Sequence, residues 1–315
     1  MINKILITGG AGSFGQAFTQ VALTEHNPEE IRIYSRGEIL QIEMEAKIKD
    51  SRLRFIIGDV RDKDRLKMAM RGVNLVVHAA ALKMIPPGES NPIEFVKTNI
   101  GGATNIIDVA IENKVEKVFG ISTDKACHPV NLYGATKMVM EKLFIQANEY
   151  SGTKFSCSRY GNVIDARGEV LQAFLSQRGR KKVTMTDERM IRYWLKVEQG
   201  VRFVIGWINK MRGGEIFVPK VPSMRLVDVA KVIVPTVEEW DIIGIRPGEK
   251  LSETMISVDE ARRTREFDDH FVIQPELSFW KEDIGGKSLP DGFRYSSDNN
   301  SWWLTKRELE KMIGL

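Results

Sequence analysis

The fold is decided by the first residues of the chain, Ile2-Asn3-Lys4-Ile5-Leu6-Ile7-Thr8-Gly9-Gly10-Ala11-Gly12-Ser13-Phe14-Gly15. Ile2 to Thr8 is a short apolar run, which predicts a buried β-strand. A helical pattern follows from about Phe14 to Thr24. Glycines between a strand and a helix N-terminus let backbone N–H groups approach a pyrophosphate, although such glycines also form ordinary turns. The candidate cofactor-binding residues here are Gly9, Ala11, Gly12, Ser13, Phe14 and Gly15.

The end of the second predicted strand, Ile31 to Tyr34, indicates which dinucleotide would bind. In a dinucleotide fold this strand end faces the adenosine ribose, where an acidic residue binds the 2′-hydroxyl of NAD. This chain has Ser35 and Arg36 at that point. An arginine suits a 2′-phosphate, so we predict NADP as the cofactor. The alternative is an arginine that is simply solvated after a strand.

Strand and helix patterns continue to alternate through the first half of the chain. Strands are predicted at Leu53–Ile57, Val73–His78 and Lys117–Ile121, with a helix over Pro92–Asn113. This alternation is typical of an α/β protein with a Rossmann-like, doubly wound parallel sheet. Residues at the strand ends are further candidate cofactor contacts: Asp59, Val60, Ala79 and Ala81. The small residues among them serve helix–sheet packing equally well.

Length and composition suggest two domains. The chain has 315 residues, 43% of them hydrophobic and 28% charged, which excludes a fibrous or disordered protein. We predict an NADP-binding domain over 1–163, with 195–220 returning to it, and a smaller α/β substrate-binding region over 164–315. The tail segment 285–301 is expected to be a loop, and Thr305–Ile313 a capped helix.

Charge and cysteine content exclude several function classes. The net charge of +4 is too small to argue for a nucleic-acid partner. Two cysteines and four scattered histidines form neither a disulfide framework nor a metal site. No apolar run approaches the ~20 residues that cross a bilayer, and no signal peptide is evident. We therefore expect a cytoplasmic protein without membrane association.

The strongest chemical motif follows the fifth predicted strand. Thr123, Asp124 and Lys125 come directly after that strand, and Tyr133 and Lys137 lie one turn apart at the start of the next helix. A nearby ammonium lowers the pKa of a phenol, which makes a tyrosine a usable general base. A lone YxxxK is common by chance, but its position after a fifth strand in this fold is specific. Tyr133 and Lys137 are therefore candidate catalytic residues.

These features resemble a known enzyme family. The glycine pattern, Asp59-Val60 and the YxxxK motif are similar to the extended short-chain dehydrogenase/reductases. Six further segments resemble the UDP-N-acetylglucosamine 4,6-dehydratases: Ser122-Thr123-Asp124-Lys125-Ala126, Asn131-Leu132-Tyr133-Gly134-Ala135-Thr136-Lys137, Arg159-Tyr160-Gly161-Asn162-Val163, Gly214-Glu215-Ile216-Phe217-Val218-Pro219-Lys220, Pro222-Ser223-Met224 and Gly244-Ile245-Arg246-Pro247-Gly248-Glu249-Lys250. The short length and Tyr133 resemble the inverting branch, which makes the first intermediate of pseudaminic acid.

The resemblance implies a role for each candidate residue. Tyr133, tuned by Lys137, takes the C4 hydroxyl proton while NADP accepts the C4 hydride, and Thr123 hydrogen-bonds the C4 oxygen. Lys125 removes the C5 proton, Asp124 assists loss of the C6 hydroxyl, the hydride returns to C6, and C5 is reprotonated on the opposite face. Lys83 and Val163 are implied at the cofactor, and relatives form closed homo-oligomers, so a dimer to hexamer is expected. The implied substrate contacts are Lys83, Asn162, Arg167, Thr186 and Arg246.

Other interpretations of these residues remain open. Asp124 and Lys125 could be an exposed pair at a strand end, and Arg246 a surface residue before a turn. A nucleotide-sugar C4 epimerase shares the tyrosine, the lysine and the cofactor but needs no Asp–Lys pair. A non-catalytic NADP-binding regulator would keep only the fold. Asp165 and Glu169 replace small residues of the relatives near the expected sugar.

Overall fold

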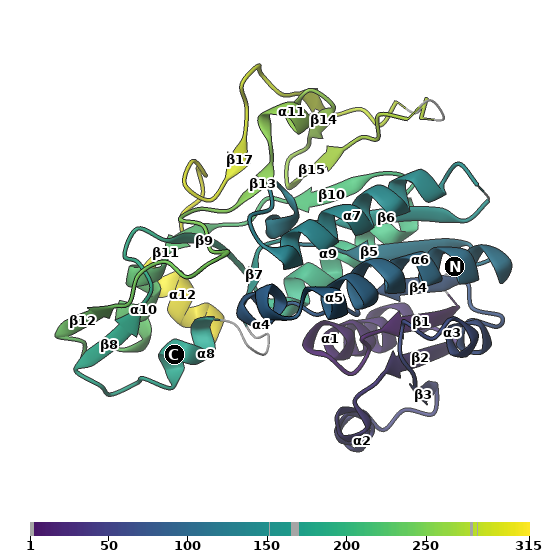
Figure 1. Cartoon of the computed structure of the whole chain (residues 1–315), viewed down its shortest axis with the longest axis horizontal. Helices are drawn as coiled ribbons and strands as arrows, with labels where there is room; N and C mark the ends of the chain where they lie inside the picture. The colour runs from purple at the N-terminus through teal and green to yellow at the C-terminus, as the bar shows by residue number, and fades with distance from the viewer. Residues whose placement is uncertain (1–2, 151, 165–169, 278–279, 282) are drawn as a thin grey trace.

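A ten-stranded sheet forms the centre of the protein (Figure 1). The computed structural model describes residues 3–150, 152–164, 170–277, 280–281 and 283–315. The strand order is β16-β14-β15-β10-β6-β5-β4-β1-β2-β3. The seven strands from β10 to β3 are parallel, and β15, β14 and β16 extend them antiparallel. The predicted doubly wound parallel sheet is confirmed.

The strands of this sheet differ in length and origin. The parallel strands are β1 (Lys4–Thr8), β2 (Glu30–Ser35), β3 (Leu53–Ile57), β4 (Leu75–His78), β5 (Lys117–Ile121), β6 (Lys154–Ser158) and β10 (Ile216–Pro219). The antiparallel strands are β14 (Thr264–Glu266), β15 (His270–Ile273) and β16 (Lys287–Ser288). These last three lie in the range predicted to bind substrate, so that range also contributes to the central sheet.

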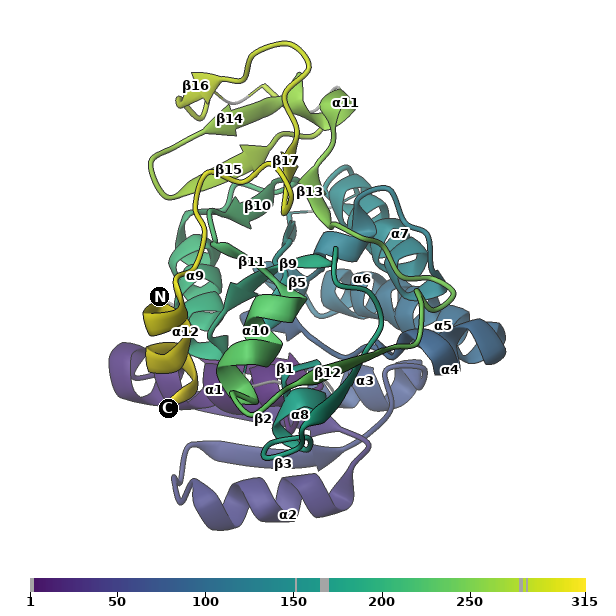
Figure 2. The ribbon, with the colours of Figure 1, turned by 90° about the vertical axis from the view of Figure 1, so that its left-hand side faces the viewer.

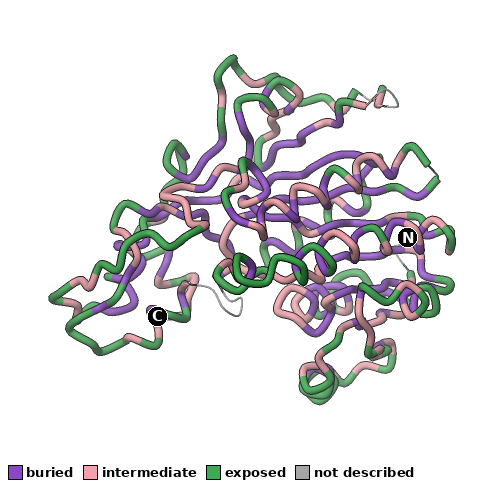
Figure 3. Tube along the Cα trace, viewed as in Figure 1, coloured by how far each residue is buried: buried purple, intermediate pink, exposed green. Residues whose placement is uncertain are grey.

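Helices cover both faces of the sheet. Helices α1 and α9 pack together on one side, and α3, α6 and α7 lie on the other (Figure 2). The helices of this part are α1 (Ser13–Val21), α2 (Glu38–Lys47), α3 (Lys63–Ala69), α4 (Ile85–Ser90), α5 (Pro92–Phe95), α6 (Gly102–Glu112), the 3₁₀-helix η3 (Asp124–Ala126), α7 (Leu132–Ala147) and α9 (Val197–Lys210). The strands between them are the most buried segments (Figure 3).

The chain reverses its direction of travel across the sheet between β1 and its neighbour β4. Strands β2 and β3 follow to one side of β1, whereas β4, β5 and β6 follow to the other. In open α/β sheets, ligands bind outside the carboxyl ends of the strands at such a switch point. The fold therefore places the glycine-rich turn after β1 and the residues after β4 and β5 at one edge.

One predicted helix is interrupted by a wider turn. The predicted helix Pro92–Asn113 consists of α5, the π-helical turn η2 (Val96–Gly101) and α6. The wide turn buries Asn99, which is 1% exposed. Its Oδ1 accepts a hydrogen bond from the backbone N–H of Leu82 at 2.8 Å. Its Nδ2 donates to the carbonyl of Leu82 and to Thr136 Oγ1, each at 2.9 Å. This π-turn thus fixes the chain that leads to Lys83, a contact that helix periodicity does not predict.

The predicted helix Phe14–Thr24 likewise ends in a π-turn, η1 (Ala22–His26).

A second, smaller core lies apart from the central sheet, on the side where the parallel strands end (Figure 1). Buried side chains such as Phe174, Trp194, Val229 and Leu309 form it. Its elements are β7 (Asn162–Val163), α8 (Val170–Leu175), β8 (Lys182–Met185), β9 (Ile191–Leu195), β11 (Ser223–Arg225), α10 (Leu226–Ile233), β12 (Glu239–Ile242) and α12 (Lys306–Ile313). A Thr305–Glu308 capping box starts α12, which confirms the predicted terminal helix.

The last part of the chain crosses back to the central sheet. Strand β13 (Thr254–Ile256) pairs antiparallel with β17 (Tyr295–Ser296), and α11 (Val258–Ala261) follows β13. Strands β16 and β17 lie inside 285–301, so the loop prediction for that segment was incomplete. Each is two residues long and pairs with a distant strand, which leaves no apolar alternation in the sequence to indicate it.

A buried charge cluster ties α7 to the end of β6 and to α11. Arg159 donates to Glu141 from Nε at 2.9 Å and Nη2 at 2.7 Å, and to Glu260 from Nη1 at 3.0 Å and Nη2 at 2.7 Å. Ser122 Oγ also donates to Glu141, at 2.5 Å. Burial opposes ionisation of Glu260, yet Arg159 lowers its pKa to about 2. The cluster fixes α7 against the segment after β5.

We expect Glu141→Ala to lower the free energy of unfolding by about 3–5 kcal/mol. The substitution removes one carboxylate of a buried ion pair and leaves the buried charge of Arg159 incompletely paired. Urea unfolding at pH 7 measures the change. Glu149→Ala, at an exposed position just after the same helix, is the control and should change the stability by less than about 0.5 kcal/mol. Equal effects of the two variants would contradict the role of the cluster.

Candidate active site

The residues after β1 form the floor of a large cavity, of about 1090 Å³, at the carboxyl edge of the sheet. Gly9 has a φ of +68°, and a Cβ there would lie 2.9 Å from the backbone N of Ala80. This position therefore requires glycine. Ala11, Gly12, Ser13 and Phe14 line the cavity. Gly15 does not, because it packs its Cα against the carbonyl of Gly10 and so allows α1 to start directly behind the turn.

The ends of β2 and β3 form one end of the cavity. It is lined by four of the predicted cofactor contacts, Ser35, Arg36, Asp59 and Val60. Arg36 Nη1 lies 3.6 Å from Asp59 Oδ2, and the Arg36 side chain is half exposed. Partial burial alone would raise the pKa of Asp59, but hydrogen bonds from Arg61 hold it below its ordinary value. Arg36 is thus a cation at the point where a dinucleotide fold presents the adenosine ribose.

Small residues after β4 form the wall between the two ends. Ala79 N–H donates to Thr8 O at 3.1 Å, and Ala80 N–H donates to Thr8 Oγ1 at 3.3 Å, so this segment lies flat against β1. Ala79, Ala81, Lys83 and Val163 all line the cavity. The glycine turn, the small wall and a cation after β2 fit a dinucleotide, which Arg36, the α1 N-terminus and the backbone of Ala79–Ala81 would hold.

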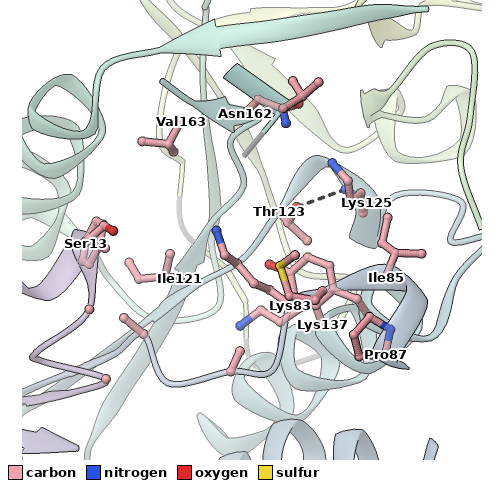
Figure 4. A pocket seen from close by; sticks show the side chains of 18 of the residues that line it. Ser13, Lys83, Ile85, Pro87, Ile121, Thr123, Lys125, Lys137, Asn162 and Val163 are labelled. Atoms are coloured by element: carbon pink, nitrogen blue, oxygen red, sulfur yellow. Dashed lines mark hydrogen bonds between the residues drawn. The ribbon is translucent and has the colours of Figure 1, made fainter. Parts of the chain in front are cut away.

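The Thr123-Asp124-Lys125 segment lies across the cavity from the glycine turn (Figure 4). Asp124 Oδ1 accepts from Thr123 Oγ1 and from Lys125 Nζ, each at 3.0 Å. Lys125 N–H donates to Thr123 Oγ1 at 3.4 Å (dashed in Figure 4). Thr123 and Lys125 line the cavity, whereas Asp124 is fully buried behind them. The alternative of an exposed pair is therefore wrong.

Helix α7 brings its first turn against this segment. Its N-cap, Asn131, accepts from Gly134 N–H at 2.8 Å. A Cβ on Gly134 would overlap the carbonyl oxygen of Lys125, so only glycine permits this approach. Tyr133 and Lys137 both face the cavity as a result. The structure thus brings Tyr133 and Lys137 together with Thr123 and Lys125 in one cavity, and Asp124 lies buried directly behind Lys125.

Lys137 is a buried ammonium with an unusual environment. It is 2% exposed, and its Nζ donates to Met140 Sδ at 3.0 Å. Burial lowers the pKa of Lys137 to about 8, although Cys157 and Glu141 oppose the shift. The side chain can therefore exchange a proton close to neutral pH, one helical turn from Tyr133.

The predicted substrate residues lie at the other end of the cavity. Asn162, Thr186 and Arg246 line it. Arg246 is half exposed and donates from Nε and Nη2 to Glu249 Oε1, at 3.0 and 2.5 Å. Arg167, Asp165 and Glu169 lie outside the described residues. Arg246 is therefore both a surface residue and a cavity residue, and its contact with the nucleotide diphosphate stays a prediction.

Two buried charged cavity residues were missed by the sequence analysis. Arg192 is 6% exposed and donates to the carbonyls of Lys250 and Leu251, at 2.8 and 3.0 Å. Glu253 is 2% exposed, and its Oε1 lies 3.5 Å from Lys125 Nζ. A single arginine in the apolar strand β9, or a glutamate three residues after Lys250, carries no local signal. Only the tertiary fold brings them to the site.

Comparisons with known proteins agree with this geometry. The model of the family described as Polysaccharide biosynthesis protein matches residues 5–275. The chain belongs to this family. It is 49% identical to the inverting UDP-N-acetylglucosamine 4,6-dehydratase of Campylobacter jejuni, over 99% of this chain and 98% of that one. The predicted resemblance to that enzyme family is confirmed.

Two further proteins are similar over nearly the whole chain. A UDP-glucose 4-epimerase of Rickettsia canadensis is 38% identical over 98% of this chain and 94% of its own. The X-ray structure of Pen from Bacillus thuringiensis superposes with a TM-score of 0.91 and 35% identity, over 99% of this chain and 97% of that one. Within the described residues, no helix is long and apolar enough to cross a membrane.

We expect Lys137→Met to stabilise the protein purified without nucleotide, by on the order of 3 kcal/mol at pH 7. The folded-state pKa of Lys137, about 8, lies below its ordinary value of 10.5. Below pH 8 the buried charge therefore costs stability, and this cost disappears as the pH rises from 8 to 10.5. Urea unfolding between pH 7 and 10 measures it, with exposed Lys142→Met as the control. A stability difference between Lys137→Met and wild type that does not shrink as the pH rises would contradict a destabilising buried charge.

Proposed function

We propose that this protein is an inverting UDP-N-acetylglucosamine 4,6-dehydratase. The product would be UDP-2-acetamido-2,6-dideoxy-β-L-arabino-hex-4-ulose, the first intermediate of pseudaminic acid synthesis. One observation carries the proposal: Lys125, paired with Asp124, shares a cavity with Tyr133 and Lys137. The dehydratase relative, at 49% identity over nearly the whole chain, supports the same reaction.

The first half of the reaction would use Tyr133, Lys137 and Thr123. Bound NADP would supply the acceptor for the C4 hydride and, later in the same turnover, the donor of a hydride to C6. Tyr133 takes the proton of the C4 hydroxyl, Lys137 one turn away favours the phenolate, and Thr123 Oγ1 donates to the C4 oxygen. A ketone at C4 then makes the C5 hydrogen acidic.

The second half would use the Asp–Lys pair. Lys125 Nζ takes the C5 proton, the C5–H electron pair forms the C5–C6 double bond, and the C6–O bond breaks. Asp124 gives its proton to the leaving oxygen, which departs as water. Protonation of C5 on the opposite face would complete the inversion. The turnover is redox-neutral, so the cofactor need not leave.

Two arginines would bind the nucleotide diphosphate. The guanidinium of Arg246 faces the cavity and is held by Glu249. That of Arg192 is buried in the same wall, with backbone carbonyls as its oxygen partners among the described residues. Planar guanidinium groups match phosphate oxygens in pairs. Lys83, Asn162, Thr186 and Arg167 stay predicted substrate contacts.

The other partners of the protein stay predictions. NADP binding to 1–163, substrate binding to 164–315, a cytoplasmic location and a closed homo-oligomer rest on the sequence. The second candidate function is a UDP-sugar C4 epimerase, which the Rickettsia relative favours. An epimerase returns the hydride to C4 and makes no use of a C5 base, so the buried Asp124 and its bond to Lys125 argue against it. The complete five-residue set argues against a non-catalytic regulator.

We expect NADP⁺ to bind more tightly than NAD⁺, through a charge-assisted contact of Arg36 that is worth roughly 1.5–3 kcal/mol. Titration of both cofactors against wild type and Arg36→Ala measures the preference. The variant should lose most of the discrimination but keep its NAD⁺ affinity. Arg54→Ala, on the neighbouring strand β3 and outside the cavity wall, is the control. An equal preference for NADP⁺ over NAD⁺ in wild type and Arg36→Ala would show that Arg36 does not select the cofactor.

The product formed in D₂O tests the function itself. With UDP-N-acetylglucosamine, proton NMR of the earliest product should show a new C6 methyl group, one deuterium at C5 and the L-arabino configuration. An early D-xylo product would instead assign a retaining dehydratase. UDP-N-acetylgalactosamine without a methyl signal would identify an epimerase.

A further inference from the structure

A second buried carboxylate lies beside Lys125, although it comes from a distant segment of the chain. Glu253 precedes β13 and lines the cavity. Its Oε1 lies 3.5 Å from Lys125 Nζ, and its Oε2 lies 3.5 Å from Lys250 Nζ. Lys125 Nζ is thus held between Glu253 and Asp124. Carboxyl and amino groups alternate along this row, in the order Asp124, Lys125, Glu253 and Lys250.

The backbone of Glu253 is held independently of its carboxylate. Its N–H donates to Ser297 Oγ at 3.0 Å, and its carbonyl accepts from Ser297 N–H at 2.8 Å. Ser297 Oγ in turn donates to Ile191 O at 3.1 Å. Residue 297 follows β17, the partner of β13. A change of the Glu253 head group should therefore leave this part of the fold in place.

Several buried oxygens around Lys125 have no hydrogen-bond partner in the described part of the chain. They are Glu253 Oε2, Asp124 Oδ2 and the hydroxyl of Tyr193. Buried polar atoms that serve only the fold are nearly always hydrogen-bonded. This corner is instead suited to receive polar groups, such as a sugar hydroxyl or the water that leaves from it.

We propose that Glu253 is a positioning residue for the elimination step: it holds Lys125 Nζ at the sugar and stabilises the ammonium that forms there. The proposal rests on the proposed function. As Lys125 takes the C5 proton and Asp124 releases its own to the leaving oxygen, a neutral pair becomes an ion pair. The carboxyl group of Glu253 faces the new ammonium, a preorganised acceptor of the kind that lowers such barriers.

The charge of Glu253 should also shape the pH dependence of C5 proton removal. A carboxylate favours the ammonium form of Lys125, so removing it should make the amine available at lower pH. The charged and titratable groups that face this pair are Asp124 on η3, Lys250 before β13, Arg192 and Tyr193 on β9, and Tyr133 and Lys137 on α7. Among the described acidic side chains, the salt bridges of Lys125 are with Asp124 and Glu253.

The test measures the two halves of the reaction separately in Glu253→Gln. With NADP⁺ and UDP-N-acetylglucosamine in D₂O, a single-turnover absorbance change reports C4 oxidation, and NMR reports C5 deuterium exchange and methyl formation. We expect C4 oxidation within about twofold of wild type, and exchange and dehydration about 10–100-fold slower. The acid limb of the exchange profile should move about one unit lower in pH. Glu238→Gln, exposed and outside the cavity wall, is the control.

A second background separates action through Lys125 from a general structural effect. In a Lys125→Ala protein, adding Glu253→Gln should slow the residual exchange no further, because coupled residues are not additive. Glu253→Asp keeps the charge, so its acid limb should stay at the wild-type pH even where its rate falls. It serves as the test if Glu253→Gln does not fold.

Three results would overturn the proposal. They are a wild-type exchange rate and profile in Glu253→Gln, a parallel loss of C4 oxidation and exchange, and an acid limb displaced in Glu253→Asp as far as in Glu253→Gln. Wild-type protein that forms no 4-ketosugar would instead contradict the proposed function, so the two failures are distinguishable.

Discussion

The contact between Gly134 and the carbonyl of Lys125 is the constraint on which the site depends. A side chain at residue 134 would overlap that oxygen, so the first turn of α7 could not pack against η3. Tyr133 and Lys137 would then move away from Thr123 and Lys125. Residues 123–125 and the first turn of α7 both follow β5. Their side chains form a single site only because the two backbones are in contact. The Arg159 cluster, which bonds Glu141 of α7 and Glu260 of α11, holds that contact from behind.

Buried charge is used in two different ways around this contact. The Arg159 cluster is closed: its two carboxylates satisfy the guanidinium, and its role is to hold elements together. The row from Asp124 to Lys250 is open, because two of its buried oxygens have no hydrogen-bond partner in the described part of the chain. Lys137 belongs to neither group: it is buried, its Nζ donates to Met140 Sδ, and burial lowers its pKa to about 8. An incompletely satisfied group costs stability unless a ligand completes it, which supports our proposal that the open row serves the reaction.

What could be predicted from the sequence was local in the chain. The glycine turn, Arg36 after β2 and the Tyr133–Lys137 spacing each lie within a few residues of the element that positions them, so pattern alone indicates their place. Arg192 and Glu253 were missed because their side chains reach the cavity only through pairing of β9 with β11 and of β13 with β17. The π-turn at Asn99 was missed because a wider turn leaves the apolar spacing of a helix nearly unchanged. The short strands β14 to β17 depend on pairing with distant partners, which no local pattern records.

The central claim is that one cavity both removes hydrogen from C4 and eliminates water across C5 and C6. UDP-N-acetylglucosamine carrying deuterium at C4, turned over in ordinary water and followed by mass spectrometry and NMR, tests this most directly. The account predicts that the deuterium appears in the C6 methyl group of the same sugar molecule, with hydrogen from solvent at C5. Deuterium that returns to C4, or that is lost to solvent, would contradict it.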